Sequence, residues 1–223
     1  METFRLKILE KKQITHDTNC FTIEKPEGYQ FVPGQATELS LLKEGWENEK
    51  RPFTFTNLPE NKHLEFIIKS YHDHEGVTKR LDEAQVGDMV EIGDAWGAIT
   101  YKGEGVFIAG GAGITPFISI FRELRKKNQI GNNSLIFANK TNSDIILFDE
   151  LKTILGNKFH NIIADQDDTA YERGLIDKAY LASKISDFKD QHFYLCGPEG
   201  FMEAVEKALK ELGANPDSLV FEQ

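Results

Sequence analysis

The pattern of apolar and polar positions changes character near the middle of the chain. In the first hundred residues, short alternating or β-branched segments are separated by glycine, proline and asparagine breakers. These segments predict one helical piece over 77–84 and β-strands over 4–14, 20–25, 36–42, 51–58, 63–71 and 89–92. Short strands at this spacing favour a closed or nearly closed antiparallel barrel.

From about Gly105 the pattern of apolar and polar positions differs from that of the first hundred residues. A short apolar run over 106–109 is typical of a buried parallel strand, and an amphipathic helix pattern over 115–129 follows it. Strand and helix patterns then alternate over 135–138, 148–155, 162–164, 176–185, 193–196 and 200–212. The alternation predicts an α/β domain with a parallel sheet, whose ligand crevice lies at the carboxyl ends of the strands. We therefore predict a barrel domain over 1–102 and an α/β domain over 103–223.

Composition narrows the class of protein. The chain has 223 residues, 40% of them apolar, and a formal net charge of −10 that its two halves share equally, which argues against nucleic-acid binding. The start of the chain has no apolar signal segment, and no run approaches the ~18 apolar residues of a membrane span. Two cysteines are too few for a four-cysteine zinc or iron–sulfur site. We expect a cytoplasmic protein without a bound metal.

The segment Arg51-Pro52-Phe53-Thr54-Phe55-Thr56 combines a guanidinium, aromatic rings and hydroxyls on one predicted strand. Side chains alternate faces along a strand, so Arg51 and Phe53 point one way and Thr54 the other. A strand end or bend could gather a ring, a hydroxyl and a fixed positive charge around a flat, phosphate-bearing ligand. A flavin is such a ligand. Taken alone, the hexapeptide also fits an ordinary barrel wall.

A glycine-rich segment, Gly110-Gly111-Ala112-Gly113-Ile114-Thr115-Pro116, follows the first strand of the α/β half. Glycines permit a tight turn and a close approach of the backbone to a ligand. Thr115 is a candidate helix N-cap, and Pro116 suits a first helical turn. The helix N-terminus then offers N–H groups to a pyrophosphate, although the spacing is not that of the usual G-x-G-x-x-G fingerprint. A tight turn without a ligand is the alternative.

A second turn, Cys196-Gly197-Pro198, ends a later strand and opens the last long helix. Its position at a carboxyl end places Cys196 at the edge of the predicted crevice. A lone cysteine is also commonly a small buried hydrophobe. The two interpretations of Cys196 remain balanced at this point.

Together these motifs resemble the ferredoxin–NADP reductase superfamily, which includes flavodoxin reductases and cytochrome b5 reductase-like modules. The resemblance covers nearly the whole chain. It rests on six motifs in the family's order: Pro33-Gly34-Gln35, Arg51 to Thr54, Gly76-Val77-Thr78, Gly87-Asp88 with Gly97, Gly110 to Pro116, and Cys196-Gly197-Pro198. It implies an N-terminal flavin-binding Greek-key barrel and a C-terminal domain that binds NADH or NADPH.

The resemblance also implies roles for single residues. Phe53 would stack on the isoalloxazine, Thr54 would place a hydroxyl near flavin N5, and Arg51, beside Pro52, would bind phosphate. Lys69 is a weaker candidate for a flavin contact. The remaining cofactor candidates are Gly76, Val77 and Thr78 for the flavin phosphate, and Gly110, Gly111, Gly113, Thr115, Pro116, Lys140, Cys196, Gly197 and Pro198 for the nucleotide. The expected catalytic residues are Thr54, Cys196 and Glu222.

The expected packing of Trp96, the type of flavin and the type of nucleotide depend on how single segments compare with the family pattern. Asp94-Ala95-Trp96-Gly97 replaces the usual segment, so we expect Trp96 to pack differently near the cofactor. The flavin is expected to be FAD, with FMN possible. The segment from Asn139 to Leu147 resembles the N-x-T-x-x-D-I-L-L pattern of NADH-using relatives, and Lys140 is its one cation, which favours NADH.

The expected function is transfer of electrons from NAD(P)H through FAD to a separate one-electron carrier. That carrier would be a ferredoxin, a flavodoxin, a cytochrome or an oxygenase component. One alternative is a two-electron reductase of small molecules or free flavin. Another is a non-catalytic flavin-binding regulatory subunit.

Overall fold

The structure is a computed structural model that describes residues 2–73, 75–167 and 170–221. By its contacts the chain divides into two compact units. The chain up to Thr100 forms the first together with Thr115–Glu123, and we call it the barrel unit. Tyr101–Ile114 and the chain from Leu124 onward form the second, which we call the α/β unit.

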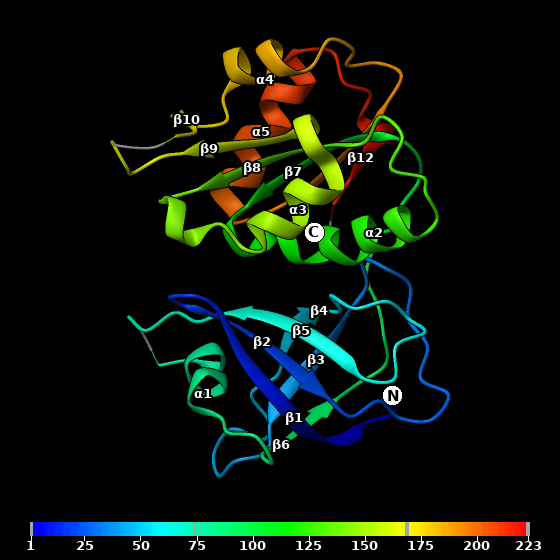
Figure 1. The fold of residues 1–223 in the computed structure, drawn as a ribbon, viewed down its shortest axis with the longest axis vertical. Helices are drawn as coiled ribbons and strands as arrows, with labels where there is room; N and C mark the ends of the chain where they lie inside the picture. The colour runs from blue at the N-terminus through cyan, green and yellow to red at the C-terminus, as the bar shows by residue number, and fades with distance from the viewer. Residues whose placement is uncertain (1, 74, 168–169, 222–223) are drawn as a thin grey trace. The chain divides into compact units, whose positions relative to one another are not determined.

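The barrel unit is built on one antiparallel sheet (Figure 1). Its strands are β1 (Phe4–Thr15), β2 (Thr18–Ile23), β3 (Ala36–Leu41), β4 (Arg51–Thr54), β5 (Leu64–Lys69) and β6 (Met89–Ile92), with helix α1 (Val77–Glu83) between the last two. They lie in the order β4-β3-β6-β1-β2-β5. A bridge between Phe55 and Phe66 and a 2.9 Å hydrogen bond from Thr56 N–H to the Glu65 carbonyl join the two ends of this order. The sheet therefore closes on itself, as the strand spacing predicted.

Aromatic rings fill the centre of the barrel. Phe55 and Phe66, on the two sides of the closing seam, are fully buried with ring centroids 5.0 Å apart. Phe31 stacks on Phe55 at 4.3 Å. Burying rings of this size supplies a large share of the hydrophobic stabilisation of so small a unit. These buried rings occupy the centre of the barrel, which directs ligands of this unit to its outer surface.

The α/β unit contains a parallel sheet. Its strands are β7 (Gly105–Gly110), β8 (Ser134–Asn139), β9 (Phe159–Ile163), β10 (Glu172–Arg173), β11 (His192–Cys196) and β12 (Leu219–Val220). Its α-helices are α3 (Phe148–Leu155), α4 (Lys178–Lys184) and α5 (Glu199–Glu211). Helix α2 (Thr115–Lys126) follows β7 in the chain, and its residues up to Glu123 belong to the barrel unit. Short 3-10 turns occur at η1 (Gly111–Ile114), η2 (Asn142–Asp144), η3 (Gly156–Lys158) and η4 (Pro216–Ser218). The predicted fold class, an antiparallel barrel followed by an α/β domain, is confirmed.

The order of the parallel strands is β10-β9-β8-β7-β11-β12. The chain runs outward from β7 through β8 and β9 and then returns to place β11 on the other side of β7. The strand order thus reverses between β7 and β11, and parallel sheets bind ligands outside the carboxyl ends at such a switch point. Gly110 ends β7 and Cys196 ends β11. The topology therefore brings the two predicted nucleotide motifs to one edge of the sheet.

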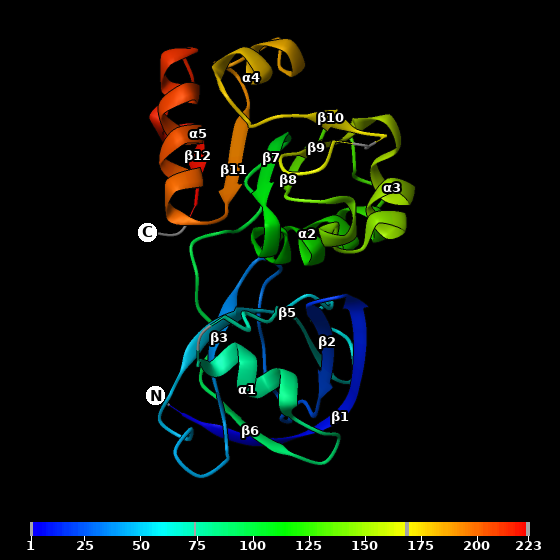
Figure 2. The same cartoon turned by 90° about the vertical axis from the view of Figure 1, so that its left-hand side faces the viewer.

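Helices α4 and α5 pack against one face of this sheet, and α3 lies on the opposite face (Figure 2). Leu181 of α4 and Leu209 of α5 are fully buried against Ile108 and Leu195 in one apolar cluster. None of the helices in the described part of the chain has the length and apolar character that crossing a bilayer requires.

The start of the α/β unit is anchored by Tyr194. Its buried hydroxyl accepts hydrogen bonds from the N–H groups of Lys102 (2.8 Å) and Gly103 (3.0 Å) and donates to the Gly103 carbonyl (2.7 Å). Burial raises the pKa of Tyr194, so the hydroxyl keeps its proton at neutral pH. The start of the α/β unit is therefore held by specific contacts with β11.

Two local expectations were wrong. Residues 55–58 continue β4 only as an isolated bridge at Phe55. Strand β10 was missed because Glu172 and Arg173 are exposed and carry no apolar pattern. Its pairing with Ile162 and Ile163 of β9 comes from the tertiary fold.

Candidate flavin and nucleotide sites

The predicted flavin residues lie on β4, an edge strand of the sheet order that pairs with β3. Phe53 is partly buried and packs against the barrel core, with Thr37 opposite it. Thr54, half-buried, pairs with Ala36, and its side chain points to the outer face. Within β4, which is regular from Arg51 to its end at Thr54, the Phe53 ring and the Thr54 hydroxyl lie on opposite faces. Of this pair, Thr54 is the one directed away from the core.

Arg51 begins β4 with a side chain that is 54% exposed. Its guanidinium donates to the Lys50 carbonyl (2.7 Å) and lies 3.5 Å from a Glu49 carboxylate that is itself half exposed. Exposed ion pairs of this kind contribute little to stability. The guanidinium can therefore exchange Glu49 for a phosphate without breaking a buried contact, and Pro52 beside it is exposed as well.

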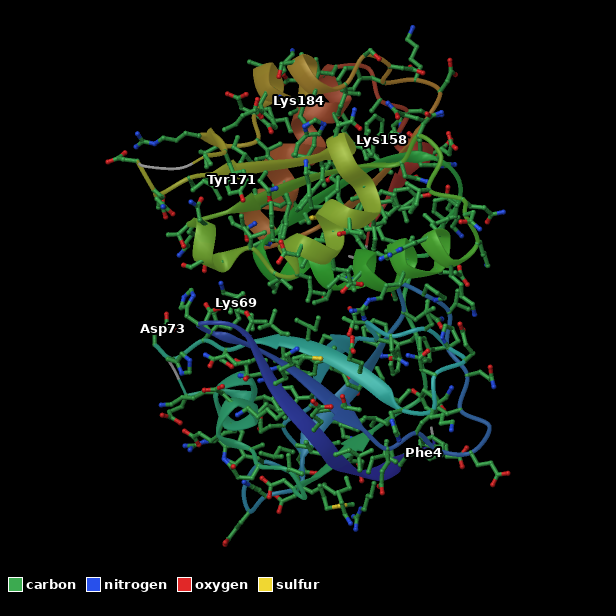
Figure 3. The ribbon with its side chains drawn as sticks, in the orientation of Figure 1. Phe4, Lys69, Asp73, Lys158, Tyr171 and Lys184 are labelled. Atoms are coloured by element: carbon green, nitrogen blue, oxygen red, sulfur yellow. The ribbon has the colours of Figure 1, made fainter. Side chains whose placement is uncertain are left out.

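Lys69 ends β5 near Asp73, at one end of the barrel unit (Figure 3). Its ammonium is 2.9 Å from Asp17, in the turn between β1 and β2. Asp17 also accepts hydrogen bonds from the hydroxyls of Thr15 and Thr18, each at 3.0 Å. Burial pushes the pKa of Asp17 upward, but the Lys69 ammonium and the hydrogen bonds from the two threonine hydroxyls outweigh it and hold the pKa below its usual value. The predicted flavin contact Lys69 is thus held by a carboxylate of its own unit.

The predicted phosphate turn Gly76-Val77-Thr78 opens α1. Gly76 is the N-cap residue in extended conformation. Val77 is 4% exposed and belongs to the barrel core, so only its backbone is available to a ligand. The Thr78 carbonyl accepts a 3.3 Å hydrogen bond from Ser70, which ties the turn to the end of β5.

The two nucleotide motifs of the α/β unit touch each other at the switch point. A Cβ atom on Gly113 would lie 2.2 Å from the Cys196 carbonyl oxygen and 2.7 Å from the Gly197 nitrogen. On Gly197 it would lie 2.5 Å from the Phe201 ring, and on Gly110 it would meet the same ring at 3.2 Å. Glycine is therefore required at Gly113 by the contact between the two loops, and at Gly197 by the Phe201 ring. Phe201, which the sequence did not single out, is the side chain that packs between them.

Gly111 differs from the other glycines of this loop. Its φ is +53°, in the left-handed region that favours glycine, and a Cβ there would meet nothing within 4 Å. Turn η1 begins at this residue and runs directly into α2. The prediction of Thr115 as an N-cap is wrong, because the helical run starts four residues earlier and Thr115 is already inside it. The first N–H groups of a helical run lack partners within it, so the open end lies at Gly111.

Cys196 is half-buried at the end of β11, and Pro198 is the N-cap residue of α5. The two predicted residues Cys196 and Gly197 thus stand at the switch point, next to Gly113. Glu222, the third predicted catalytic residue, lies outside the described residues.

A loop from β8 and a loop from β9 lie side by side at the same sheet edge. The Asp165 N–H donates to the Lys140 carbonyl (2.8 Å), and the Asn142 N–H donates to the Gln166 side chain (2.8 Å). The side chains of Lys140, Asp165 and Asp167 are exposed. Lys140, the one cation predicted to bind a 2′-phosphate, therefore lies in a region that also carries carboxylates.

Comparison with known families agrees with this two-part arrangement. An oxidoreductase FAD-binding domain model matches residues 5–101, and an oxidoreductase NAD-binding domain model matches residues 107–207. The chain belongs to the ferredoxin–NADP reductase-like superfamily. It is accordingly an NAD(P)H-dependent flavoprotein reductase of that superfamily.

Individual members of the superfamily are distant. NADH-cytochrome b5 reductase 1 of Bos taurus is 26% identical over 96% of this chain and 84% of its own length. The reductase component of propane 2-monooxygenase from Rhodococcus jostii is 26% identical over 89% of this chain and 57% of its own length. A ferredoxin–NADP⁺ reductase structure from Neisseria gonorrhoeae, with bound FAD and NADP, has a TM-score of 0.86 at 20% identity. It covers 100% of this chain and 98% of its own chain, and at this identity it shows the common fold.

The residues present fit the two groups that the superfamily domains bind. The barrel unit offers an outward hydroxyl on Thr54 and an exposed guanidinium on Arg51, both on β4. The α/β unit offers a helical N-terminus with open space over Gly111 at the switch point of its sheet. When bound, FAD takes up two electrons from a reduced nicotinamide nucleotide and can release them one at a time.

Proposed function

We propose that this reductase passes electrons from NADH to a separate one-electron carrier protein. The observation that carries the nucleotide half of the proposal is the contact between Gly113 and the Cys196 carbonyl at the sheet's switch point. This contact places a helix N-terminus that is suited to bind phosphate beside a half-exposed cysteine at one edge of the sheet. A nucleotide whose pyrophosphate is held at Gly111 to Gly113 would extend past Cys196.

In this proposal the protein binds and orients the flavin and the nucleotide, and its side chains do little acid–base chemistry. Arg51 pairs with the flavin phosphate through charge-assisted hydrogen bonds, and the Gly76 to Thr78 turn adds backbone donors. Phe53 packs against the barrel core and holds β4 in place, and the Thr54 hydroxyl supplies a hydrogen bond near the reactive nitrogen of the flavin. A hydroxyl without an activating partner is a poor base, so we assign Thr54 to tuning and orientation. Cys196 and Thr115 are each assigned to binding of the nicotinamide.

NADH is the proposed donor because of the charges around Lys140. A 2′-phosphate is normally recognised by a fixed arginine or lysine. Here the Lys140 carbonyl accepts a hydrogen bond from the Asp165 N–H, and the exposed carboxylate of Asp165 would repel the additional phosphate of NADPH. Arg173 and Asp167 form an exposed ion pair at 2.5 Å, in which each charge partly neutralises the other.

A protein carrier is the proposed acceptor because relatives in the superfamily are named for such partners. One is a cytochrome b5 reductase and another is a monooxygenase reductase component. The two cysteines of this chain, one per unit, cannot ligate an iron–sulfur cluster within these residues. The carrier of single electrons would then be a ferredoxin, a flavodoxin, a cytochrome or an oxygenase component, and the net charge of −10 favours one that is not strongly acidic.

The test is an anaerobic titration of the purified protein, followed in the visible spectrum, first with NADH and then with NADPH. We expect a flavin spectrum that NADH bleaches faster than NADPH. A flavin spectrum that neither nucleotide changes would refute the reductase proposal and favour a non-catalytic subunit.

The acceptor is tested in the same cuvette by adding a ferredoxin, a flavodoxin or cytochrome b5, with free FMN as the small-molecule control. Reoxidation by one of the proteins at low micromolar concentration, and faster than by free FMN, is the expected result. Turnover of free FMN at a rate that no protein carrier exceeds would show a two-electron reductase of small molecules instead.

A further inference from the structure

Trp96 is a large aromatic side chain on the outer surface of the barrel unit, with 42% of its area exposed. Its backbone is held firmly. The Trp96 N–H donates to the Ala36 carbonyl, and the Ala36 N–H donates to the Trp96 carbonyl, both at 2.8 Å. These two bonds form a bridge beyond the end of β6, and Gly97, with φ at +132°, turns the chain away immediately after it. The exposed ring is thus carried by an ordered strand end.

The register of the sheet places this ring beside the predicted flavin strand. Ala36 pairs with Trp96 on one side and with Thr54 on the other. Directly opposed residues of antiparallel strands carry their side chains on the same face, so Thr54, Ala36 and Trp96 form one row. Trp96 and Thr54 are two strand spacings apart, about 10 Å. The Ala36 side chain between them is a single methyl group, 3% exposed.

This row lies on the outer face of β3 and β4. Phe53, the neighbour of Thr54, packs against the barrel core, so Thr54 must point away from it. The Ala36 methyl group is almost fully buried, so the Trp96 ring and the Thr54 hydroxyl are the groups that this row offers to a ligand. An aromatic ring and a hydroxyl about 10 Å apart match a flat ring system with an apolar end and polar atoms toward the other end. An isoalloxazine has that character.

We infer that Trp96 packs against the isoalloxazine of the bound flavin and completes its site on the side of β3 opposite Thr54. This inference rests on the proposed flavin site at β4. It explains why a large aromatic ring lies exposed on a hydrogen-bonded strand end, with only β3 between it and that site.

The chain provides a matched control, because Trp46 is its other tryptophan. Trp46 is half-buried, packs against the barrel core and has the Arg80 guanidinium 5.2 Å from its ring centroid. Trp46 lies in the segment between β3 and β4, and its ring already packs against other residues of the protein. Replacing it changes the tryptophan content by the same amount without touching the proposed row.

The experiment compares flavin emission and flavin retention in wild type, Trp96→Phe, Trp96→Ala and Trp46→Phe. An indole in contact with a flavin quenches its emission, because it donates an electron to the excited flavin and takes it back without net chemistry. Phenylalanine keeps the packing but cannot donate. We expect Trp96→Phe to retain flavin and raise the emission lifetime several-fold, with Trp46→Phe unchanged. Trp96→Ala should also weaken FAD binding, roughly tenfold for the loss of one ring contact.

Equal emission lifetimes in wild type, Trp96→Phe and Trp46→Phe would overturn the inference, and so would a rise confined to Trp46→Phe. Circular dichroism of each variant verifies that it is folded. Bleaching of the wild type by NADH is measured separately and does not depend on emission. Bleaching together with unchanged lifetimes would therefore reject Trp96 and leave the proposed function intact.

Discussion

Replacing Gly113 by alanine tests how tightly the two nucleotide loops are packed. The new Cβ would sit 2.2 Å from the Cys196 carbonyl oxygen, about 1.2 Å short of the 3.4 Å at which ordinary contact begins. The atoms it meets, in Cys196 and Gly197, belong to the backbone, so no side chain can rotate away. One of the loops must move by about 1 Å.

Overpacking of this kind costs about 1–3 kcal/mol. For a chain of this length, each kcal/mol lowers the melting temperature by about 2–4 °C. The effect on catalysis should be larger than the effect on stability, because a misplacement of about 1 Å can cost roughly a hundredfold in rate. We therefore expect Gly113→Ala to melt a few degrees lower and to lose about two orders of magnitude in kcat/KM for NADH, with flavin content unchanged.

Two further glycines separate crowding from other effects. Gly200, the second residue of α5, has nothing within 4 Å of a built Cβ, so Gly200→Ala should be neutral or stabilise by up to about 1 kcal/mol. Gly111→Ala introduces backbone strain of about 1–2 kcal/mol at φ +53° without a clash. Calorimetry and steady-state kinetics on the three variants distinguish the effect of crowding from the effect of backbone strain. If Gly113→Ala behaved like Gly200→Ala in both assays, the tight contact with Cys196 would be refuted.

Three other predictions concern the remaining sites. Arg51→Ala should weaken FAD binding by about 1.5–3 kcal/mol, the value of a hydrogen bond to a charged group, and purification with full flavin occupancy would contradict it. Cys196→Ala should slow flavin reduction by NADH in stopped flow while flavin content stays constant; unchanged kinetics would return Cys196 to a structural role. The folded-state pKa of Asp17 lies below the usual value of 3.8, so its contribution to stability is present above that pH and is lost as the pH falls through the folded pKa. Asp17→Asn should therefore be less stable than wild type at neutral pH, and the difference should shrink in acid; urea titrations at pH 7 and near pH 3 measure it.

Local patterns in the sequence were sufficient for the division into a barrel and an α/β half and for most of the strands and helices. The reason is that strand alternation, helical periodicity and turn residues such as Pro33-Gly34 and Gly87-Asp88 act over a few neighbours. The glycine loop at Gly110 and the turn at Cys196 could be recognised for the same reason, since each is a short strand–helix junction. The chemistry of their residues alone makes both segments candidates for nucleotide binding.

Only the tertiary structure decided which of these residues meet. The close contact of Gly113 with Cys196 depends on β11 returning beside β7, and the row of Thr54, Ala36 and Trp96 depends on the register of three strand segments. The pairing of Lys69 with Asp17 and the start of the helical run at Gly111 are likewise decided by packing. Contacts between residues far apart in sequence arise from strand order and register, which hydrophobic periodicity leaves open because many registers bury the same apolar face.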